Sequence, residues 1–238
     1  MHTIINSKLV SRNAKIGQYA MLGTFIVLGI GLFLTITQPN LLTYPMITLV
    51  IIVGFFLSQV GTYYTNRWGR KPRPDEIIDR SLKGLDREYT LYHYVTPVHH
   101  LLVGPAGVWV IMPFYQNGTV SYTKNRWRIR GGGFAQTYLR FFGQEGLGRP
   151  DLESEADAEN LKRYFKRRLL EDNQIPEVRS ALLFAHPQVD LQVDEAPLPA
   201  LRPKELKEFM RKKGKEEPLP KLQLEALRQV LPQPQKEE

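Results

Sequence analysis

Two long apolar runs dominate the N-terminal part of the chain. They cover residues 16–37 and 41–64, and no Asp, Glu, Lys or Arg occurs from residue 16 to residue 66. Each run is close to the roughly 20 apolar residues that an α-helix needs to cross a bilayer. A polar, helix-breaking triplet, Gln38-Pro39-Asn40, separates them. The pattern therefore predicts a two-helix transmembrane hairpin over residues 16–66, with a very short external turn.

Basic residues flank both apolar runs, whereas the turn between them is uncharged. By the positive-inside rule, residues 1–15 form a cytoplasmic N-terminus and residues 67–75 a basic juxtamembrane linker. We therefore expect a multi-pass protein of the cell membrane, with both termini and the soluble domain cytoplasmic. A signal peptide is the alternative for the first run, but the run is longer than a usual signal core and a second run follows at once. The basic flanks are Lys8, Arg12 and Lys15 on one side, and Arg67, Arg70, Lys71 and Arg73 on the other.

The soluble part is organised around two apolar runs of strand length, residues 98–103 and 108–112. Gly104-Pro105-Ala106-Gly107 breaks them, and this combination predicts a tight hairpin between two largely buried strands. Alternation also predicts strands at residues 88–95, 119–122 and 126–130, and a short apolar run predicts another at 178–185. Periodicity of three and four predicts helices at 75–82, 151–170 and 203–212. Strand, helix and strand in this order indicate an α/β crossover.

The C-terminal residues 214–238 are rich in Pro, Lys and Glu. This composition predicts a disordered tail, with one short amphipathic helix over residues 222–231 as the alternative for part of it.

The net charge of +8 is unevenly distributed. The seven basic residues of the membrane flanks account for +7, because no acidic residue precedes Asp75, and only +1 remains for the rest of the chain. The overall charge is thus explained by membrane topology and anionic lipid, and does not by itself indicate a nucleic-acid-binding domain. The absence of cysteine agrees with a cytoplasmic domain but does not discriminate.

The central hairpin resembles that of the nuclease-related domain (NERD) family, a branch of the PD-(D/E)xK nuclease-like fold. The hallmark of that family is Asp-His, an apolar run, Gly-Pro-x-Gly, a second apolar run, then Glu-x-Lys and a turn containing Gly. The residues that match its framework are His100, Gly104, Pro105, Gly107 and Gly118. The resemblance implies a restriction-endonuclease-like α/β/α domain with a central mixed sheet over residues 76–213.

The catalytic positions of that pattern are replaced in this chain. His99 stands in the Asp position, Met112 in the Glu position and Phe114 in the Lys position. Hard Mg²⁺ prefers oxygen ligands, so an imidazole, a thioether and a phenyl ring do not make a magnesium site. His99 and His100 are adjacent on a strand and point to opposite faces, so they do not chelate one ion. We expect a degenerate nuclease domain without a metal or cofactor.

An active nuclease with a relocated site is the alternative. Glu88 matches a Glu that the family often carries upstream of the hairpin, and it would have to combine with Glu145, Asp151 or Glu153 around Mg²⁺. A lone carboxylate beside a strand is more commonly a solvated surface residue.

Arg126, Arg128 and Arg130 alternate along one predicted strand and should share a face. Lys124 and Arg140 are candidates to join them. Such a row can hold phosphates of nucleic acid or of anionic lipid without a metal, although alternating charges also protect a solvated strand edge. The sequence predicts a membrane-anchored, nuclease-related binding or scaffold module whose ligand is nucleic acid, anionic lipid or a protein.

Overall fold

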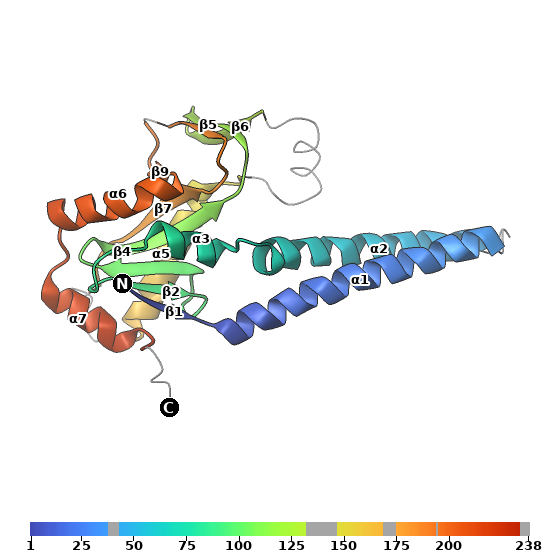
Figure 1. Cartoon of the computed structure of the whole chain (residues 1–238), viewed down its shortest axis with the longest axis horizontal. Coiled ribbons are helices and arrows are strands. Elements are labelled where there is room, and N and C mark those ends of the chain that lie inside the picture. Colours follow the sequence, from blue (N-terminus) through green and yellow to red (C-terminus); the bar gives the residue numbers. More distant parts are fainter. Residues whose placement is uncertain (38–42, 132–146, 169–174, 194, 234–238) are drawn as a thin grey trace. The chain divides into compact units, whose positions relative to one another are not determined.

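The structure is a computed structural model that describes residues 1–37, 43–131, 147–168, 175–193 and 195–233. The chain forms two compact units (Figure 1). One is a helical unit made by the described residues of Ser7–Arg73. The other, which we call the sheet unit, combines Met1–Asn6 with the described residues from Pro74 onward.

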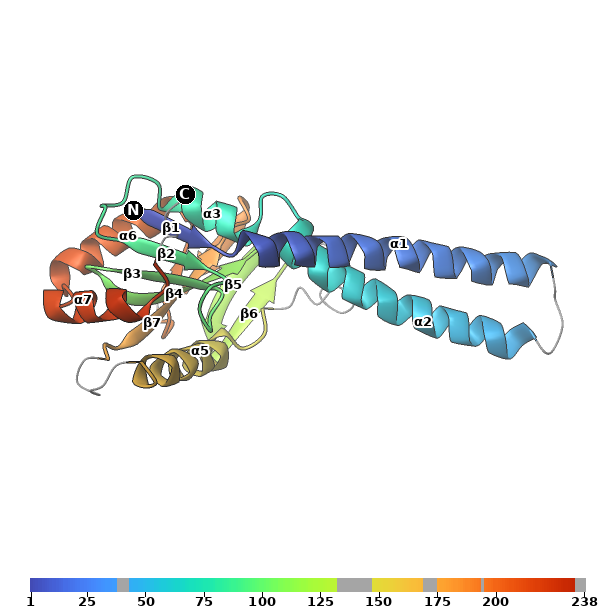
Figure 2. The ribbon, with the colours of Figure 1, turned by 90° about the horizontal axis from the view of Figure 1, so that it is seen from below.

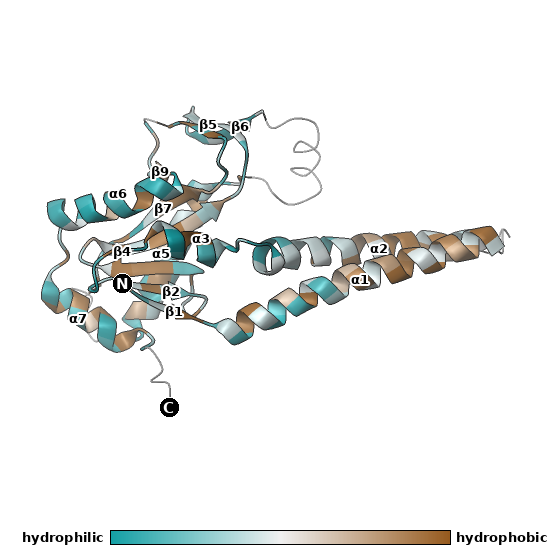
Figure 3. Ribbon diagram, in the orientation of Figure 1, coloured by the Kyte–Doolittle hydropathy of each residue, from teal (hydrophilic) through white to brown (hydrophobic). Residues whose placement is uncertain are grey.

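The helical unit consists of α1 (Ser7–Thr37), α2 (Thr43–Tyr64) and the π-helical turn η1 (Thr65–Gly69). The helices α1 and α2 lie side by side (Figure 2). Small residues allow this approach, because a Cβ added at Gly54 would come within 2.7 Å of Leu28 on α1. The outward residues are apolar and uncovered (Figure 3), since Phe25, Phe33 and Ile36 are 69%, 64% and 72% exposed. Both helices are long and apolar enough to cross a membrane.

The first helix starts nine residues before the predicted apolar run, at Ser7 instead of residue 16. The polar stretch between these positions contains Lys, Leu, Arg and Ala, which are good helix formers, so the helix extends into the basic flank. With 31 residues, α1 is about 46 Å long, which exceeds the ~30 Å hydrocarbon core of a bilayer.

The sheet unit is built on a six-stranded mixed sheet with the order β1-β2-β3-β4-β7-β9. β2, β3 and β4 pair antiparallel in sequence, whereas β1 pairs with β2, β7 with β4 and β9 with β7 in parallel. The mixed sheet of the predicted α/β class is confirmed. The strands are β1 (His2–Ile5), β2 (Thr90–His93), β3 (His100–Gly104), β4 (Gly107–Phe114), β7 (Val178–Phe184) and β9 (Ala200–Leu201).

The predicted hairpin is present as β3 and β4, joined by the two-residue turn Pro105-Ala106. Gly104 pairs with Gly107 across the turn, and Gly107 has a φ of +103°, which favours glycine. Gly104 is required for a second reason, because a Cβ there would collide with the ring of Tyr89. The indole N–H of Trp109 donates to the carbonyl of Ala106 at 2.8 Å and fixes the turn.

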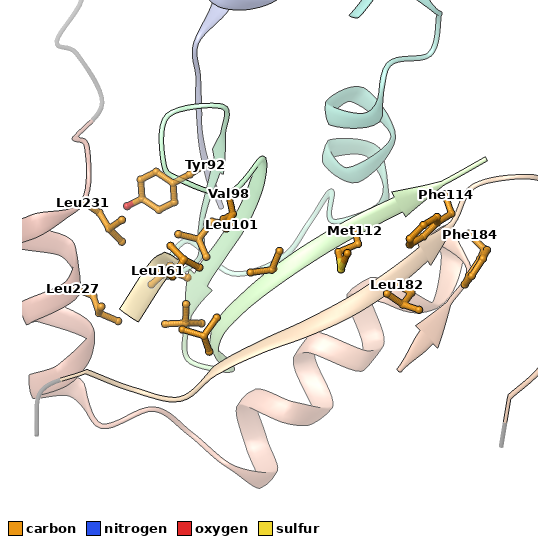
Figure 4. Packing of buried hydrophobic residues seen from close by; sticks show 14 of the residues in the cluster. Tyr92, Val98, Leu101, Met112, Phe114, Leu161, Leu182, Phe184, Leu227 and Leu231 are labelled. Carbon is orange, nitrogen blue, oxygen red and sulfur yellow. The ribbon is translucent and has the colours of Figure 1, made fainter. Parts of the chain in front are cut away.

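Helices cover both faces of the main sheet. On one face, Ile78 of α3 (Pro74–Ser81) and Leu206 of α6 (Pro203–Glu216) pack with Leu91, Leu102 and Ile111. The opposite face carries α5 (Pro150–Lys166) and α7 (Lys221–Val230). Figure 4 shows this second cluster, in which side chains of α5 and α7 meet those of β3, β4 and β7. The sheet is therefore a middle layer between two helical layers.

A smaller sheet with the order β6-β5-β8 follows the end of β4. β5 (Gly118–Thr123) pairs antiparallel with β6 (Arg126–Arg130) and parallel with β8 (Val189–Gln192). Val120, Trp127 and Val189 point to the same core as β4 and β7. The small sheet thus has one apolar face and one outward face.

Two predicted domain boundaries need correction. Residues 1–15 are not merely a flank, since His2–Ile5 form the edge strand β1 of the main sheet. Residues 214–238 are not a disordered tail over the described part, because α6 extends to Glu216 and α7 follows it, close to the amphipathic helix given as the alternative for residues 222–231. Leu224, Leu227 and Leu231 are spaced by three and four residues and are buried. This amphipathic spacing outweighs the polar composition of the segment.

Candidate functional site

The three positions aligned with nuclease chemistry lie at different places in the sheet unit. His99 is exposed and immediately precedes β3. Met112 and Phe114 are only 9% exposed and belong to the core under α5. The ring of Phe114 stacks on Phe184 of β7, with centroids 5.4 Å apart (Figure 4). Met112 and Phe114 therefore serve as packing residues.

The acids of the relocated-site alternative are not assembled among the described residues. Glu88 is exposed, and its backbone carbonyl accepts a hydrogen bond from Arg228 of α7 at 2.7 Å. It stands two residues before β2, whose Thr90 pairs with Val103 near the β3–β4 turn. Met112 lies towards the other end of the hairpin. Glu88 is thus not placed to complete a metal site at Met112.

Asp151 has a different environment in the first turn of α5. The guanidinium of Arg149 donates to both of its carboxylate oxygens, at distances of 2.7 to 3.3 Å. This hydrogen bonding holds the pKa of the Asp151 carboxyl below its ordinary value. Glu153 is exposed on the same helix, and Glu145 lies outside the described residues. Within the described ranges, no three His, Cys, Asp or Glu side chains come together as a metal site would require.

A buried polar cluster that the sequence analysis missed lies at one end of the β2–β3 pair, on the sheet face that α3 covers. His93 and His100 are direct cross-strand partners, and their Nδ1 atoms are 2.8 Å apart. Both side chains are buried, and Nε2 of His93 lies 3.7 Å from a carboxylate oxygen of Asp79 on α3. The hydroxyl of Thr3 on β1 donates to the same Asp79 oxygen at 2.9 Å.

This arrangement is a hydrogen bond between the two imidazole rings. One Nδ1 must donate and the other must accept, so the short contact requires that at least one ring be neutral on that atom. The two Nδ1 atoms face each other at hydrogen-bond distance instead of converging with the Asp79 carboxylate on one point, so the cluster is not arranged as a zinc site. Its contacts join three elements, β1, α3 and the β2–β3 pair, which favours a structural role.

The arginine row lies on an exposed face of the small sheet. Arg126, Arg128 and Arg130 are exposed, whereas Trp127 between them is 7% exposed, so the predicted alternation is confirmed. In the β5–β6 register these arginines stand opposite residues with hydroxyl side chains, which share their face: Thr123, Ser121 and Thr119, respectively.

The outward face is completed by β8, where Asp190 and Gln192 align with Thr119 and Ser121. The amide of Gln192 donates to the Asp190 carboxylate at 2.8 Å. No ion pair is formed by the three arginines with the residues that the structure describes. We call this surface, made of Arg126, Arg128, Arg130, Thr119, Ser121 and Thr123, the arginine face.

Lys124 is exposed in the turn between β5 and β6, next to the arginine face. Lys124 and Asn125 have positive φ values of 52° and 56°, which fits a two-residue hairpin turn with both central residues in the left-handed region. Arg140, the other predicted member, lies outside the described residues.

Comparisons with protein-family models, with curated proteins and with solved structures find no match to this chain. The resemblance of the hairpin to nuclease-related domains therefore rests on its own residues.

Proposed function

We propose that this protein is a membrane-anchored cytoplasmic module of the nuclease-related type that has lost nuclease chemistry and binds the phosphate backbone of nucleic acid through the arginine face. The observation that carries the proposal is the pairing of three exposed arginines with three hydroxyl side chains on one outward face. Guanidinium and hydroxyl groups are the side-chain donors that proteins commonly direct at phosphate oxygens. Backbone contacts of this kind need no catalytic metal.

The loss of chemistry is supported by the burial of two of the three aligned positions, Met112 and Phe114. Met112 and Phe114 belong to the buried apolar cluster, and neither side chain offers the oxygen ligand that Mg²⁺ prefers. The three-layer arrangement and the mixed sheet are compatible with a restriction-endonuclease-like fold.

The membrane topology is supported by β1. This strand precedes the first apolar helix, yet it pairs with β2, which follows the second. One sheet can include both strands only if the chain returns to the side on which it started, which two spans accomplish. The basic flanks then favour the cytoplasmic side for the domain and both termini.

Binding of anionic lipid is a second candidate, favoured by the short connections to the helices. Only Asn6 separates β1 from α1, and four residues, 70–73, separate η1 from α3. Four residues span at most about 14 Å, so the sheet unit is held near the bilayer surface.

The test uses the full chain in nanodiscs of neutral phosphatidylcholine, titrated with single- and double-stranded DNA and RNA. We expect binding that weakens with salt, and the variant R126Q/R128Q/R130Q should reduce the slope of log K against log salt by about 2 to 3. The matched control K204Q/K215Q/K221Q removes three exposed charges elsewhere on the sheet unit and should leave the slope nearly unchanged.

Three outcomes would overturn parts of the proposal. If the triple variant and its control lost nucleic-acid affinity equally, the arginine face would be only a solvated strand edge. Binding that appears only when the disc contains phosphatidylserine, and not with any nucleic acid, would favour lipid. Cleavage with Mg²⁺ or Mn²⁺ that disappears in Glu88→Gln would favour an active nuclease with a relocated site.

A further inference from the structure

A cleft of about 220 Å³ lies beside the second half of α5, remote in sequence from the arginine face. The loop between β2 and β3 contributes Pro97 to its wall. Asn160, Arg163 and Tyr164 come from one face of α5, at spacings of three and four, and Arg167 and Arg168 come from the turn that follows the helix. Its lining includes three guanidinium groups and no carboxylate.

The guanidinium groups are only partly neutralised. Arg163 lies 3.5 Å from Glu159, but both side chains are more than half exposed and the pair is weak. The guanidinium of Arg168 lies 3.9 Å above the ring of Tyr164 and donates to the Tyr164 carbonyl at 3.5 Å. No described carboxylate pairs with Arg167 or Arg168. The stacking holds one guanidinium plane in place and leaves its outer edge available to a ligand.

The helix dipole offers another explanation for basic residues here, since cations are favoured in the last turns of a helix. That effect is not selective for one face, and Lys162 and Lys166 provide charge outside the cleft. It also does not account for three arginines that converge on one hollow with Pro97. The C-terminal end contributes only about half a negative charge, against three full positive charges.

We propose that this cleft binds a small phosphate monoester. Arginine forks match the oxygens of a phosphate in bidentate fashion, and the Asn160 amide and the Tyr164 ring can contact the group that the phosphate carries. The volume is below the ~300 to 1,000 Å³ of typical small-molecule sites, so the ligand is a compact one. The phosphate monoester comes either from a free metabolite or from a lipid headgroup.

The probe is glycerol 3-phosphate, titrated calorimetrically into the full chain in phosphatidylcholine nanodiscs, with sulfate as a competitor at constant ionic strength. We expect saturable binding that sulfate displaces poorly. The variant R167Q/R168Q should weaken it at least about tenfold, which corresponds to the loss of one good charged contact. K162Q/K166Q removes the same charge from α5 outside the cleft and should change the dissociation constant by less than about twofold.

Two further variants keep the test decisive. R167K/R168K retains the charge but not the fork, and should also weaken binding. Asn160→Leu leaves all charges in place and narrows the cleft, so it should weaken glycerol 3-phosphate binding. This variant separates loss of the site from loss of folding if R167Q/R168Q shifts the unfolding midpoint. A wild-type titration without saturable heat up to ~10 mM, or equal weakening in K162Q/K166Q, would overturn the proposal.

The source of the phosphate is resolved by adding phosphatidic acid to the disc. If phosphatidic acid competes with glycerol 3-phosphate, the ligand is a lipid headgroup. If it does not compete, the ligand is a free phosphate monoester.

The proposal does not rest on the arginine face. R126Q/R128Q/R130Q should bind glycerol 3-phosphate normally, so failure of one site is distinguishable from failure of the other.

Discussion

Phe114→Lys tests the core assignment of Phe114, the position that the proposed nuclease resemblance aligns with a catalytic Lys. Lys is the residue that the nuclease pattern has at this point, so the substitution moves the sequence towards the active pattern. Phe114 is 9% exposed and stacks on Phe184, and it belongs to the cluster beneath α5. A charged side chain at this position must either lose its hydration or displace the packing.

The magnitude follows from burial. Removing a buried Phe side chain typically costs about 3 to 5 kcal/mol, and its interaction with a stacked ring adds to this cost. The Lys stem regains part of the apolar contact, but the ammonium group must reach solvent or lose its charge. We expect a net destabilisation of about 3 to 5 kcal/mol, a large share of the ~5 to 15 kcal/mol of a typical domain. Adding Met112→Glu should lower the free energy of unfolding further, because the attraction between two buried opposite charges at alternate positions on a strand offsets only part of their desolvation cost.

The assay is urea unfolding of the full chain in nanodiscs, followed by tryptophan fluorescence, with a parallel nuclease assay in Mg²⁺. Leu152→Lys is the control: Leu152 is 49% exposed on α5, so the same chemical change should stay within about 0.5 kcal/mol. If M112E/F114K were as stable as the control and cleaved nucleic acid, these positions would be accessible and the core assignment would be refuted.

Three smaller predictions concern other described contacts. His100→Ala should destabilise the sheet unit by about 1 to 3 kcal/mol, because it leaves Nδ1 of His93 buried without its partner, and the loss should appear in urea unfolding. Arg149→Gln should raise the pKa of the Asp151 carboxyl towards its ordinary value in a carbon-detected NMR titration; since the pKa is lowered in the folded state, the stabilisation it reflects is present above pH ~4 and is lost as the pH falls through the folded-state pKa. Tyr89→Phe should lower stability by about 1 to 3 kcal/mol in urea unfolding, since the buried hydroxyl donates a hydrogen bond of 3.3 Å to the Met210 carbonyl of α6 and is also hydrogen-bonded to the backbone of Ala106.

The elements that could be predicted from sequence are those with local signals. The β3–β4 hairpin follows from two apolar runs around a Gly-Pro-Ala-Gly turn, and β6 was predicted with its observed bounds, Arg126–Arg130. The helix α5 was predicted at residues 151–170, and its described part runs over Pro150–Lys166. In each case the periodicity or the turn chemistry is contained in one short window.

The elements that could not be predicted depend on distant partners. β1 and β9 have four and two residues, too few to establish an alternation, and β8 has four. They are strands because β1 pairs with β2, β8 with β5 and β9 with β7. The His93–His100 pair has the same origin. It depends on the antiparallel register across the intervening loop, and sequence spacing alone does not determine that register.

The position of β1 explains why the helical hairpin can interrupt the sheet unit without separating its parts. His2 pairs with Thr90, 88 residues further along. Closing so long a flexible loop would cost about 2 kcal/mol more than closing one of ten residues. The described parts of the intervening chain are mostly helical, however. A Cβ added at Gly17 near the start of α1 would come within 2.9 Å of Thr65 after α2, so the helical unit brings its own two ends together. The helical hairpin is therefore the connection between the parallel strands β1 and β2. A crossover helix connects the parallel strands β4 and β7 in the same way.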